Sequence, residues 1–588
     1  GAGDFQFTRP FTQRLPAFSD SSSGNAIASL LLGDPSGGII QNTPILAYRW
    51  GYYGFYFQDD LKVSRKLTLN VGVRYDIEGS PTERYDRMNR GFSAAPSPLA
   101  GAVRNANPSD CPACSNLIGG LQFVTGSNRQ AFNTEYSHMQ PRFGAAYALS
   151  SRTVVRGGIG VFYLPEAAYG GSAGFSADTP FVSTIGGGVN GFIPATTLSN
   201  PFPNGLVQPT GSSLGAATFL GNNIIFSNPN RSIPHTVQYS FGVQHQLPGN
   251  VRVDASYVGS RTYDINTNDN QAGSARNLNV NTPDQLAQAR QNSSFFNQAV
   301  PNPFAGLLPN NPGFNGATVP RQRLLLPFPQ FGQVLEAQES VGKIWYDSLQ
   351  VNVEKRYSAD LVLVAAYTFS KNLESVQYLN DQDPKTSKAL TSQDRPQRLV
   401  LSGVYGLPFG KGKRFLTGVN RGWEQLVGGW EYNFIGTLQS GTPFNYLGNV
   451  DLIGNPQTGD ANFNSYFNGC VQQLNGTALA PDPARNGKFV TCTNPAWAIR
   501  GPNTLRTIPF RSGQLRNPWA KQWDMSLNKR FNFTERWNAQ FRLEAFNVFN
   551  TPILGAPNNN PTDPNFGFVT RNQSNFPRQV QLGFKLNF

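Results

Sequence analysis

The sequence predicts an all-β fold, a transmembrane antiparallel up-and-down β-barrel, from three features. Segments of alternating apolar and polar residues recur along the chain, and the last one, Gln579–Phe588, alternates strictly and ends on an aromatic residue. No stretch approaches the roughly 18 consecutive apolar residues that a spanning helix needs. Short turns join the segments into pairs, whereas long stretches rich in Asn, Gly and Pro separate the pairs. Short turns at one rim and long loops at the other are typical of barrels that cross a membrane.

Six hairpins and one closing strand make up the predicted wall. Each hairpin consists of two alternating segments around a short turn, except the fifth, whose connection is longer. The pairs are Trp50–Val63 with Leu67–Asp76, Arg142–Leu149 with Thr153–Tyr163, Thr236–Leu247 with Val251–Gly259, Asp347–Tyr357 with Leu361–Phe369, Arg398–Leu407 with Trp430–Gln439, and Trp523–Phe533 with Trp537–Phe549.

The parity of the strands predicts a barrel larger than this chain. We expect one further strand within 37–49 and another at Phe5–Thr8, with a turn at Ala26–Leu32 on the periplasmic side between them. That makes about 14–15 strands, whereas a barrel with both termini in the periplasm usually has an even number. Residues 1–588 are therefore expected to form a single β-barrel domain, the C-terminal portion of a larger barrel.

Composition excludes several function classes. The net charge is +13, but no cluster of Lys and Arg suggests nucleic acid, so a basic wall or contact with anionic lipopolysaccharide fits better. The three histidines, His138, His235 and His245, have no nucleophile motif beside them. The glycines of 157–160 lie inside a predicted strand, so they are not a phosphate loop. We expect no enzyme and no catalytic, cofactor-binding or metal site.

The four cysteines fall into two local pairs in loop-like sequence, Cys111 with Cys114 and Cys470 with Cys492. A zinc site requires all four to converge, and a redox motif requires a βαβ context. Disulfides formed in an oxidising compartment are the favoured interpretation, with metal binding and free thiols left open.

Charged residues on the polar positions of the strands are candidates for the barrel lumen. In lipid each of them would be costly at mid-depth, so they must face the lumen or lie at a rim. Their mixed signs predict a salt-bridged wall. The candidates are Arg74, Arg156, Arg252, Asp254, Glu354, Arg542, Glu544 and Lys585.

The apolar positions of the last strand are a candidate outer-membrane insertion signal. A chain that ends in mid-pattern on an aromatic residue resembles the closing strand of bacterial outer-membrane barrels, whose terminal aromatic the assembly machinery reads. The residues of this signal are Val580, Leu582, Phe584, Leu586 and Phe588.

Several segments resemble the TonB-dependent receptor superfamily, specifically its Oar-like branch. The hairpin formed by Tyr53–Val63 and Leu67–Asp76 is similar to a family hairpin, and the further similar segments are Pro141–Tyr147, Arg156–Tyr163, Tyr367–Lys371 and Glu544–Asn550. The resemblance implies a 22-stranded barrel in the Gram-negative outer membrane that encloses an N-terminal plug, and often a sandwich domain before the plug. Neither part is recognisable in this sequence.

The resemblance also implies a function and its partners. The best hypothesis is energy-coupled uptake of a scarce nutrient such as a siderophore, glycan or peptide. The TonB energy complex would act through an N-terminal region outside this chain, and outer-membrane lipid, lipopolysaccharide and the barrel assembly machinery are the other expected partners. A non-transporting adhesion or assembly scaffold and a passive porin are the alternatives. Substrate recognition is expected in the long loops, within Phe181–Phe226, Asn292–Gln333 and Asn449–Arg511.

Overall fold

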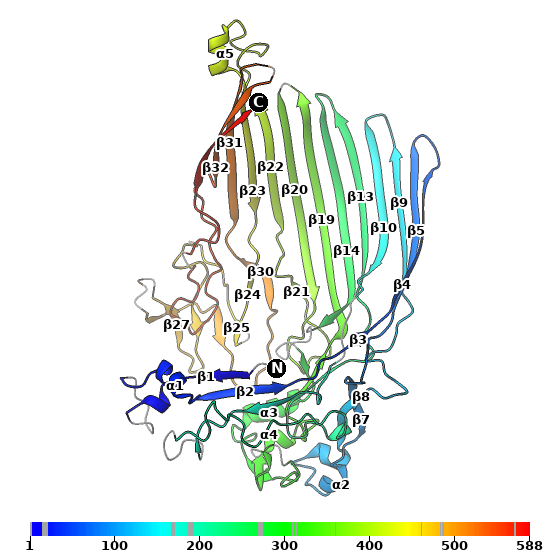
Figure 1. Ribbon diagram of the computed structural model, residues 1–588, viewed down its shortest axis with the longest axis vertical. Helices are drawn as coiled ribbons and strands as arrows, with labels where there is room; N and C mark the ends of the chain where they lie inside the picture. The colour runs from blue at the N-terminus through cyan, green and yellow to red at the C-terminus, as the bar shows by residue number, and fades with distance from the viewer. Residues whose placement is uncertain are drawn as a thin grey trace.

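A computed structural model shows one large curved antiparallel sheet with a layer of folded loops at one end (Figure 1). The structure describes the chain except residues 1–2, 15–21, 166–170, 186–192, 268–274, 309–310, 312–313, 359, 448, 460, 483, 485–486, 535 and 570–571.

Thirteen strands follow one another across the large sheet in chain order, each antiparallel to the next. The two-residue strand β21 (Ala389–Leu390) pairs with β20 (Leu361–Ser375) and brings the total to fourteen. All six predicted hairpins and the closing strand are confirmed as strands of this sheet. The wall strands are β4 (Tyr52–Lys62), β5 (Leu67–Glu78), β9 (Met139–Ala148), β10 (Thr153–Tyr163), β13 (His235–Leu247), β14 (Val251–Thr267), β19 (Glu339–Ser358), β20 (Leu361–Ser375), β22 (Gln397–Gly406), β23 (Trp430–Gln439), β31 (Ala520–Asn532), β32 (Asn538–Phe546) and β33 (Gln579–Asn587).

The two ends of this sheet differ as the sequence predicts. At one end, here called the turn rim, consecutive wall strands are joined by residues 63–66, 149–152, 248–250, 359–360, 407–429 and 533–537. At the other end, the loop rim, they are joined by residues 79–138, 164–234, 268–338, 376–396, 440–519 and 547–578. The C-terminus and helix α5 (Arg421–Val427) lie at the turn rim (Figure 1).

The remaining strands and the helices lie in these connections and in the segment that precedes β4. The strands are β1 (Gly3–Gln6), β2 (Gly37–Asn42), β3 (Tyr48–Arg49), β6 (Thr82–Glu83), β7 (Asn89–Pro96), β8 (Ile118–Phe123), β11 (Ala177–Pro180), β12 (Ile224–Ser227), β15 (Arg276–Asn277), β16 (Ala299–Pro301), β17 (Thr318–Pro320), β18 (Val334–Ala337), β21 (Ala389–Leu390), β24 (Pro443–Asn445), β25 (Val450–Leu452), β26 (Val471–Gln472), β27 (Ala478–Pro481), β28 (Phe489–Thr491), β29 (Trp497–Ile499) and β30 (Arg511–Arg516). The helices are η1 (Pro10–Thr12), α1 (Ala26–Leu32), α2 (Ala100–Val103), η2 (Pro112–Asn116), η4 (Gly215–Ala217), α3 (Pro283–Gln291), α4 (Arg321–Leu324) and α5 (Arg421–Val427). Within the described part of the chain, none of the helices has the length and apolar character that crossing a membrane requires.

The expectation of two more wall strands near the N-terminus is wrong. β1 and β2 pair with each other, and β2 also pairs with β11, in a separate three-stranded sheet at the loop rim. Residues 26–32 form helix α1 at the same end, not a turn on the opposite side (Figure 1). The four and six residues of β1 and β2 are too few for a membrane strand, which needs about 9–11.

Strand register divides the side chains of the wall into two faces of opposite character. On one face Val71 lies opposite Phe143, Phe143 opposite Ile159, and Ile159 opposite Tyr239. Val71, Phe143 and Ile159 are exposed although they are apolar. A continuous row of exposed apolar side chains is suited to lipid and not to water. This apolar face therefore provides the membrane contact, and the polar face lies on its other side.

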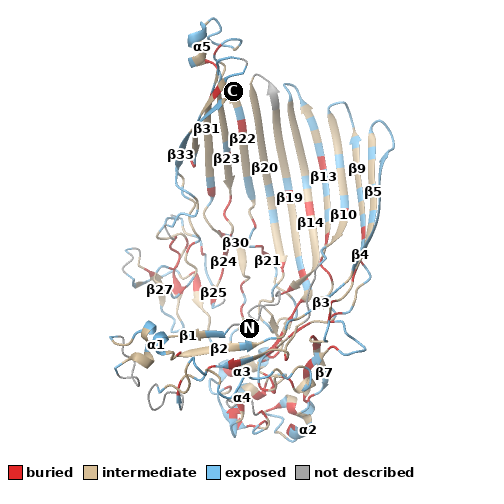
Figure 2. Cartoon of the chain, in the orientation of Figure 1, coloured by how far each residue is buried: buried red, intermediate tan, exposed pale blue. Residues whose placement is uncertain are grey.

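Buried side chains gather in the loops and are sparse in the wall (Figure 2). The described hydrophobic clusters draw almost all of their members from the loop-rim connections. The loops are therefore folded units with cores of their own, and the wall is a sheet one layer thick.

Adjacent residues of β22 offer a matched test of the two faces. Leu401 lies on the apolar face opposite Ala365 and Gly436, whereas Ser402 lies on the polar face. We expect Leu401→Arg to cost about 2–4 kcal/mol of stability in a bilayer, because an arginine at mid-depth on the lipid face must leave water. Ser402→Arg should cost much less. Denaturant titration of the chain refolded into lipid vesicles measures both, and equal costs would contradict the assignment of the faces.

Candidate functional site

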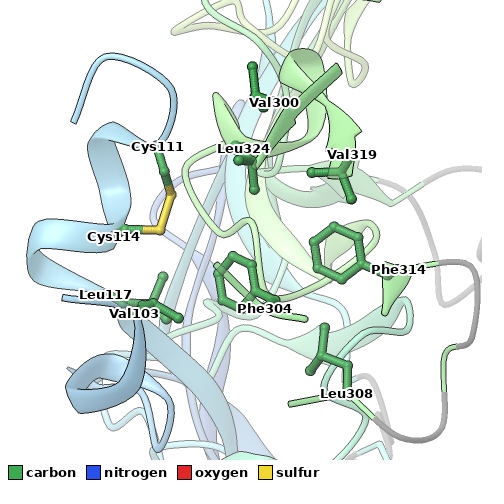
Figure 3. Packing of buried hydrophobic residues seen from close by; sticks show 10 residues of the cluster. All are labelled: Val103, Cys111, Cys114, Leu117, Val300, Phe304, Leu308, Phe314, Val319 and Leu324. Atoms are coloured by element: carbon green, nitrogen blue, oxygen red, sulfur yellow. A yellow bond between two sulfur atoms is a disulfide. The ribbon is translucent and has the colours of Figure 1, made fainter. Parts of the chain in front are cut away.

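The loops of the loop rim pack into a layer, and one of their two larger described cores joins two of them. Figure 3 shows Val103, Leu117 and the disulfide of Cys111 and Cys114, from residues 79–138, against side chains of residues 268–338. Phe304 and Phe314 stack there with ring centroids 5.5 Å apart. An ion pair between Arg321 Nε and Asp110 Oδ1, 3.1 Å apart, links the same two loops. Hydrophobic packing and one charged contact thus hold these two connections together.

A third loop joins the layer through a mixed sheet. β12 of residues 164–234 pairs in parallel with β18 of residues 268–338. Beneath this pairing, Ile224 and Phe226 pack on Leu121, Phe331 and Val334. The cluster therefore contains side chains from three loop-rim connections.

The loop of residues 440–519 forms a second unit around one tryptophan. β25, β29, β26, β27 and β28 make a five-stranded sheet, here called the disulfide module because Cys470 and Cys492 are bonded within it. Trp497 is 1% exposed and donates its indole N–H to the Asn468 carbonyl at 2.7 Å. Phe467 and Phe566 meet the Trp497 ring edge to face, at centroid distances of 5.8 and 5.9 Å. Because the core is aromatic and the indole N–H has a partner, the module has a defined packing.

Backbone carbonyls and side chains connect the disulfide module to the rest of the layer. Arg290 donates to the Asn503 carbonyl at 2.6 Å, and the Asn380 side chain bonds both the N–H and the carbonyl of Arg506. The loop layer is thus one assembly over the loop rim, which is where substrate recognition was predicted.

Cavities open in this layer, and two of them, each of a size suited to a small ligand, bear on its chemistry. One of about 480 Å³ lies in the disulfide module, with Asn464, Asn468 and Phe568 among its lining residues. The other, of about 550 Å³, is here called the amide cavity because Asn and Gln side chains dominate its lining. It lies between three loops, with Asn223, Arg323 and Gln382 among its lining residues.

All eight lumen candidates lie on the polar face of the wall, and several of them contact one another. Arg156 pairs with Asp254, and Arg252 Nη2 lies 2.5 Å from Glu354 Oε2. The others have local partners: Arg74 pairs with Asp76 at 2.9 Å, Arg542 donates to Gln540 at 3.0 Å, Gln581 donates to Glu544, and Lys585 lies opposite Gln540. The polar face therefore carries linked charges of both signs, and its role as a lumen stays a prediction.

The closing strand β33 presents four of the five signal residues on the apolar face, and the fifth, Phe588, directly follows the strand. Val580, Leu582, Phe584 and Leu586 lie opposite apolar-face residues of β32, and Phe588 stacks on Trp537 with ring centroids 5.4 Å apart. This places an aromatic pair at the turn rim. Recognition of the strand by assembly machinery stays a prediction.

Two of the three histidines lie in a row of ring side chains that the sequence does not reveal. His138, Tyr163, His235 and Tyr263 follow one another at the loop-rim ends of adjacent strands, with centroids 4.6, 5.1 and 5.4 Å apart. The third histidine, His245, bonds Thr153 at 2.9 Å near the turn rim. No group of three or more His, Cys, Asp and Glu side chains is placed to bind a metal among the residues that the structure describes.

The chain matches a family model described as "Outer membrane beta barrel domain" over residues 1–581. No curated protein matches the sequence. Among solved structures it is similar to FpvAI in complex with pyocin S2, at 11% identity over 94% of this chain and 40% of that one, with a TM-score of 0.37. It is similar to Pseudomonas aeruginosa FpvA bound to heterologous pyoverdines, at 11% identity over 97% and 40%, with a TM-score of 0.35.

A third similar structure is Fiu, the ferric-catecholate import receptor of Escherichia coli K12, at 10% identity over 94% of this chain and 45% of that one, with a TM-score of 0.34. The chain thus spans less than half the length of each of these three structures.

The two disulfides differ in the length of chain that they close, and their removal should differ accordingly. The bond between Cys470 and Cys492 spans 22 residues, whereas that between Cys111 and Cys114 spans 3. Replacing both Cys470 and Cys492 with Ala should lower the stability of the disulfide module by about 3 kcal/mol. Without the crosslink, the unfolded module regains the conformational entropy that closing the loop had removed. Hydrogen exchange of β26 and β29 measures this, with the Cys111→Ala, Cys114→Ala variant as the short-loop control. An equal or larger effect on the module in the control would contradict it.

Acid should loosen the disulfide module through Asp451. Burial opposes ionisation of Asp451, but hydrogen bonds from Arg500 at 2.7 and 3.3 Å and from Thr507 at 3.2 Å outweigh it, so its pKa is lowered. Since the folded pKa lies below the ordinary value of about 3.9, the stabilisation is complete above that value and is lost as the pH falls through the folded pKa. Hydrogen exchange of β25 and β29 between pH 5 and pH 2 should show the loss. Asp451→Asn should remove this part of the pH dependence, and an unchanged profile would contradict the assignment.

Proposed function

The chain belongs to the outer membrane beta barrel domain family, and we propose that it forms the wall and outer mouth of an energy-coupled receptor for a scarce nutrient. The observation that carries the proposal is the loop layer, which is folded over one rim and contains ligand-sized cavities. Loops with cores of this kind have fixed surfaces, and a fixed surface is what selective capture of a ligand requires.

The polar face of the wall supports a transporter more than a scaffold. A scaffold requires only that the barrel be stable, whereas a receptor of the TonB-dependent kind needs a polar interior against which a plug can dock. The linked pairs of Arg156 with Asp254 and of Arg252 with Glu354 provide hydrogen-bonding charges on adjacent strands. In this proposal, TonB would act through a plug that is not recognisable in the sequence, within a barrel of 22 strands of the Oar-like type.

Excision of the disulfide module tests this function. Val450 and Ile499 are register partners at its base, so residues 451–498 can be replaced by a two-residue Asn-Gly turn that closes the same strand pair. The matched control changes only the exposed tip of the same module, replacing residues 474–476 by Gly-Ser-Gly. Correct insertion of both variants is checked by the heat-modifiable electrophoretic mobility of the folded barrel.

The readout is growth of a bacterium that expresses the gene product, on media limited in turn for chelated iron, oligosaccharide and peptide. We expect an advantage on one of these nutrients that falls tenfold or more in the excision variant and in a strain without TonB, and that the control retains. Growth that does not need TonB would indicate a passive porin and overturn the proposal. Loss of surface attachment with no growth effect would indicate a scaffold and would also overturn it.

A further inference from the structure

The amide cavity contains a charge for which the described structure provides no counter-charge. Arg323 lies on α4 and lines this cavity, and no acidic side chain is among the described lining residues. Its Nε is buried without a hydrogen-bond partner, and no described residue forms an ion pair with its guanidinium. The contact that it does make is with an aromatic face, since its Cζ lies 4.5 Å from the centroid of the Phe314 ring.

Other arginines of the loop layer show how unusual this arrangement is. Arg321, two residues earlier on the same helix, pairs with Asp110 at 3.1 Å. Arg506 is 8% exposed but donates to the carbonyls of Ile508, Tyr446 and Pro509 at 2.8 to 3.2 Å. Both have the partners that a buried guanidinium normally requires. Arg323 therefore differs from its neighbours in partners and not in residue type.

Acidic side chains of the neighbouring loop segments have hydrogen-bond partners of their own. Asp381 accepts from the Asn277 N–H at 3.4 Å, Asp383 from the Asn380 N–H at 2.9 Å, and Glu336 from the Asn228 side chain at 2.8 Å. Burial lowers the pKa of Arg323, yet an arginine stays protonated at any physiological pH. The cavity thus holds a permanent positive charge on a partly buried side chain, with a planar fork of donors suited to an oxyanion.

The rest of the cavity has a different chemistry, that of uncharged amides. The Gln322 side chain donates to Asn281 Oδ1 at 3.3 Å, and Gln382 donates to the Asn281 backbone carbonyl at 3.1 Å. Leu286 and Leu326 add an apolar part to the lining. Amides that are fixed in this way can both donate to and accept from the hydroxyl groups of a ligand. A cavity of about 550 Å³ has room for a ligand of one or two sugar rings.

We propose that the amide cavity is a binding subsite for an acidic, hydroxyl-rich small molecule, whose carboxylate or phosphate group is held by Arg323 while the amides meet its hydroxyl groups. The claim that this bound molecule is the nutrient taken up rests on the proposed function. The claim that the cavity binds such a molecule rests only on the cavity and on the Arg323 guanidinium without an ion-pair partner. It predicts that charge selects the ligand at this position.

Binding to the whole chain in detergent micelles tests the proposal without any energy coupling. The probes are sodium glucuronate, glucose and glucose 6-phosphate, titrated by calorimetry at low salt. The wild-type chain should bind at least one of the two anionic sugars tenfold or more tightly than glucose, since a charge-assisted bond to a partly buried guanidinium is gained. Preference for glucuronate would assign the subsite to carboxylates, and preference for glucose 6-phosphate would assign it to phosphate esters.

Variants at two arginines separate the subsite from general attraction to a basic protein. Arg323→Gln should lose the preference for the anion, Arg323→Lys should keep part of it, and Arg104→Gln, at an exposed site in a neighbouring loop, should leave it unchanged. Equal affinity of the wild-type chain for glucose and both anions would overturn the proposal, as would an undiminished preference in Arg323→Gln. Either result would leave the uptake proposal standing, because that proposal is tested by growth and by the disulfide module.

Discussion

Hydrogen bonding of the backbone between neighbouring strands is the constraint on which the rest of the structure depends. Within lipid no water is present to satisfy an N–H or a carbonyl, so a strand can cross only if another strand lies beside it. The wall meets this condition with long antiparallel ladders, such as the pairing of β13 with β14 over 235–247. Since the side chains of a strand alternate, each ladder fixes one apolar and one polar face at once. The division of the wall into a membrane face and a charged face therefore follows from the ladder itself.

A wall one layer thick has no interior, and this explains why the buried core lies in the loops. The described wall strands pack against lipid on one face and carry polar groups on the other, so neither face offers a partner for a buried hydrophobic cluster. The loop-rim connections are long enough to build their own clusters, with Phe304 and Trp497 at two of the centres. Because these cores do not depend on the wall, the loop layer can vary its cavities without disturbing the ladders beneath it.

The sequence predicts the wall well and the loop layer poorly, for a physical reason. Alternation with period two is a local pattern, so the hairpins and the closing strand could be found from neighbouring residues alone. The two cysteine pairs are likewise close in sequence. The family match confirms the outer-membrane β-barrel. The resemblance pointed to this class correctly, while its Oar-like branch and its 22 strands remain predictions. The same reasoning was wrong for β2, whose partners β1 and β11 are set by contacts distant in sequence. Arg323 was missed for the same cause, since nothing in Arg321–Leu324 distinguishes the paired arginine from the unpaired one.

The contrast between the charges of the wall and Arg323 bears on where specificity lies. On the wall, Arg252 is matched by Glu354 directly across one ladder, so a passing ligand would have to displace a partner that is already in place. At Arg323 no such partner exists among the described residues, and the cost of partly burying the charge has already been met by the folding of the loops. An incoming oxyanion therefore gains the interaction without breaking another. Matched charges suit a surface that must stay stable while different solutes pass, and an unmatched charge suits a site that must choose among them. Selection at the loop layer, followed by passage along a wall with paired charges such as Arg252 and Glu354, is the arrangement that these two kinds of charge favour.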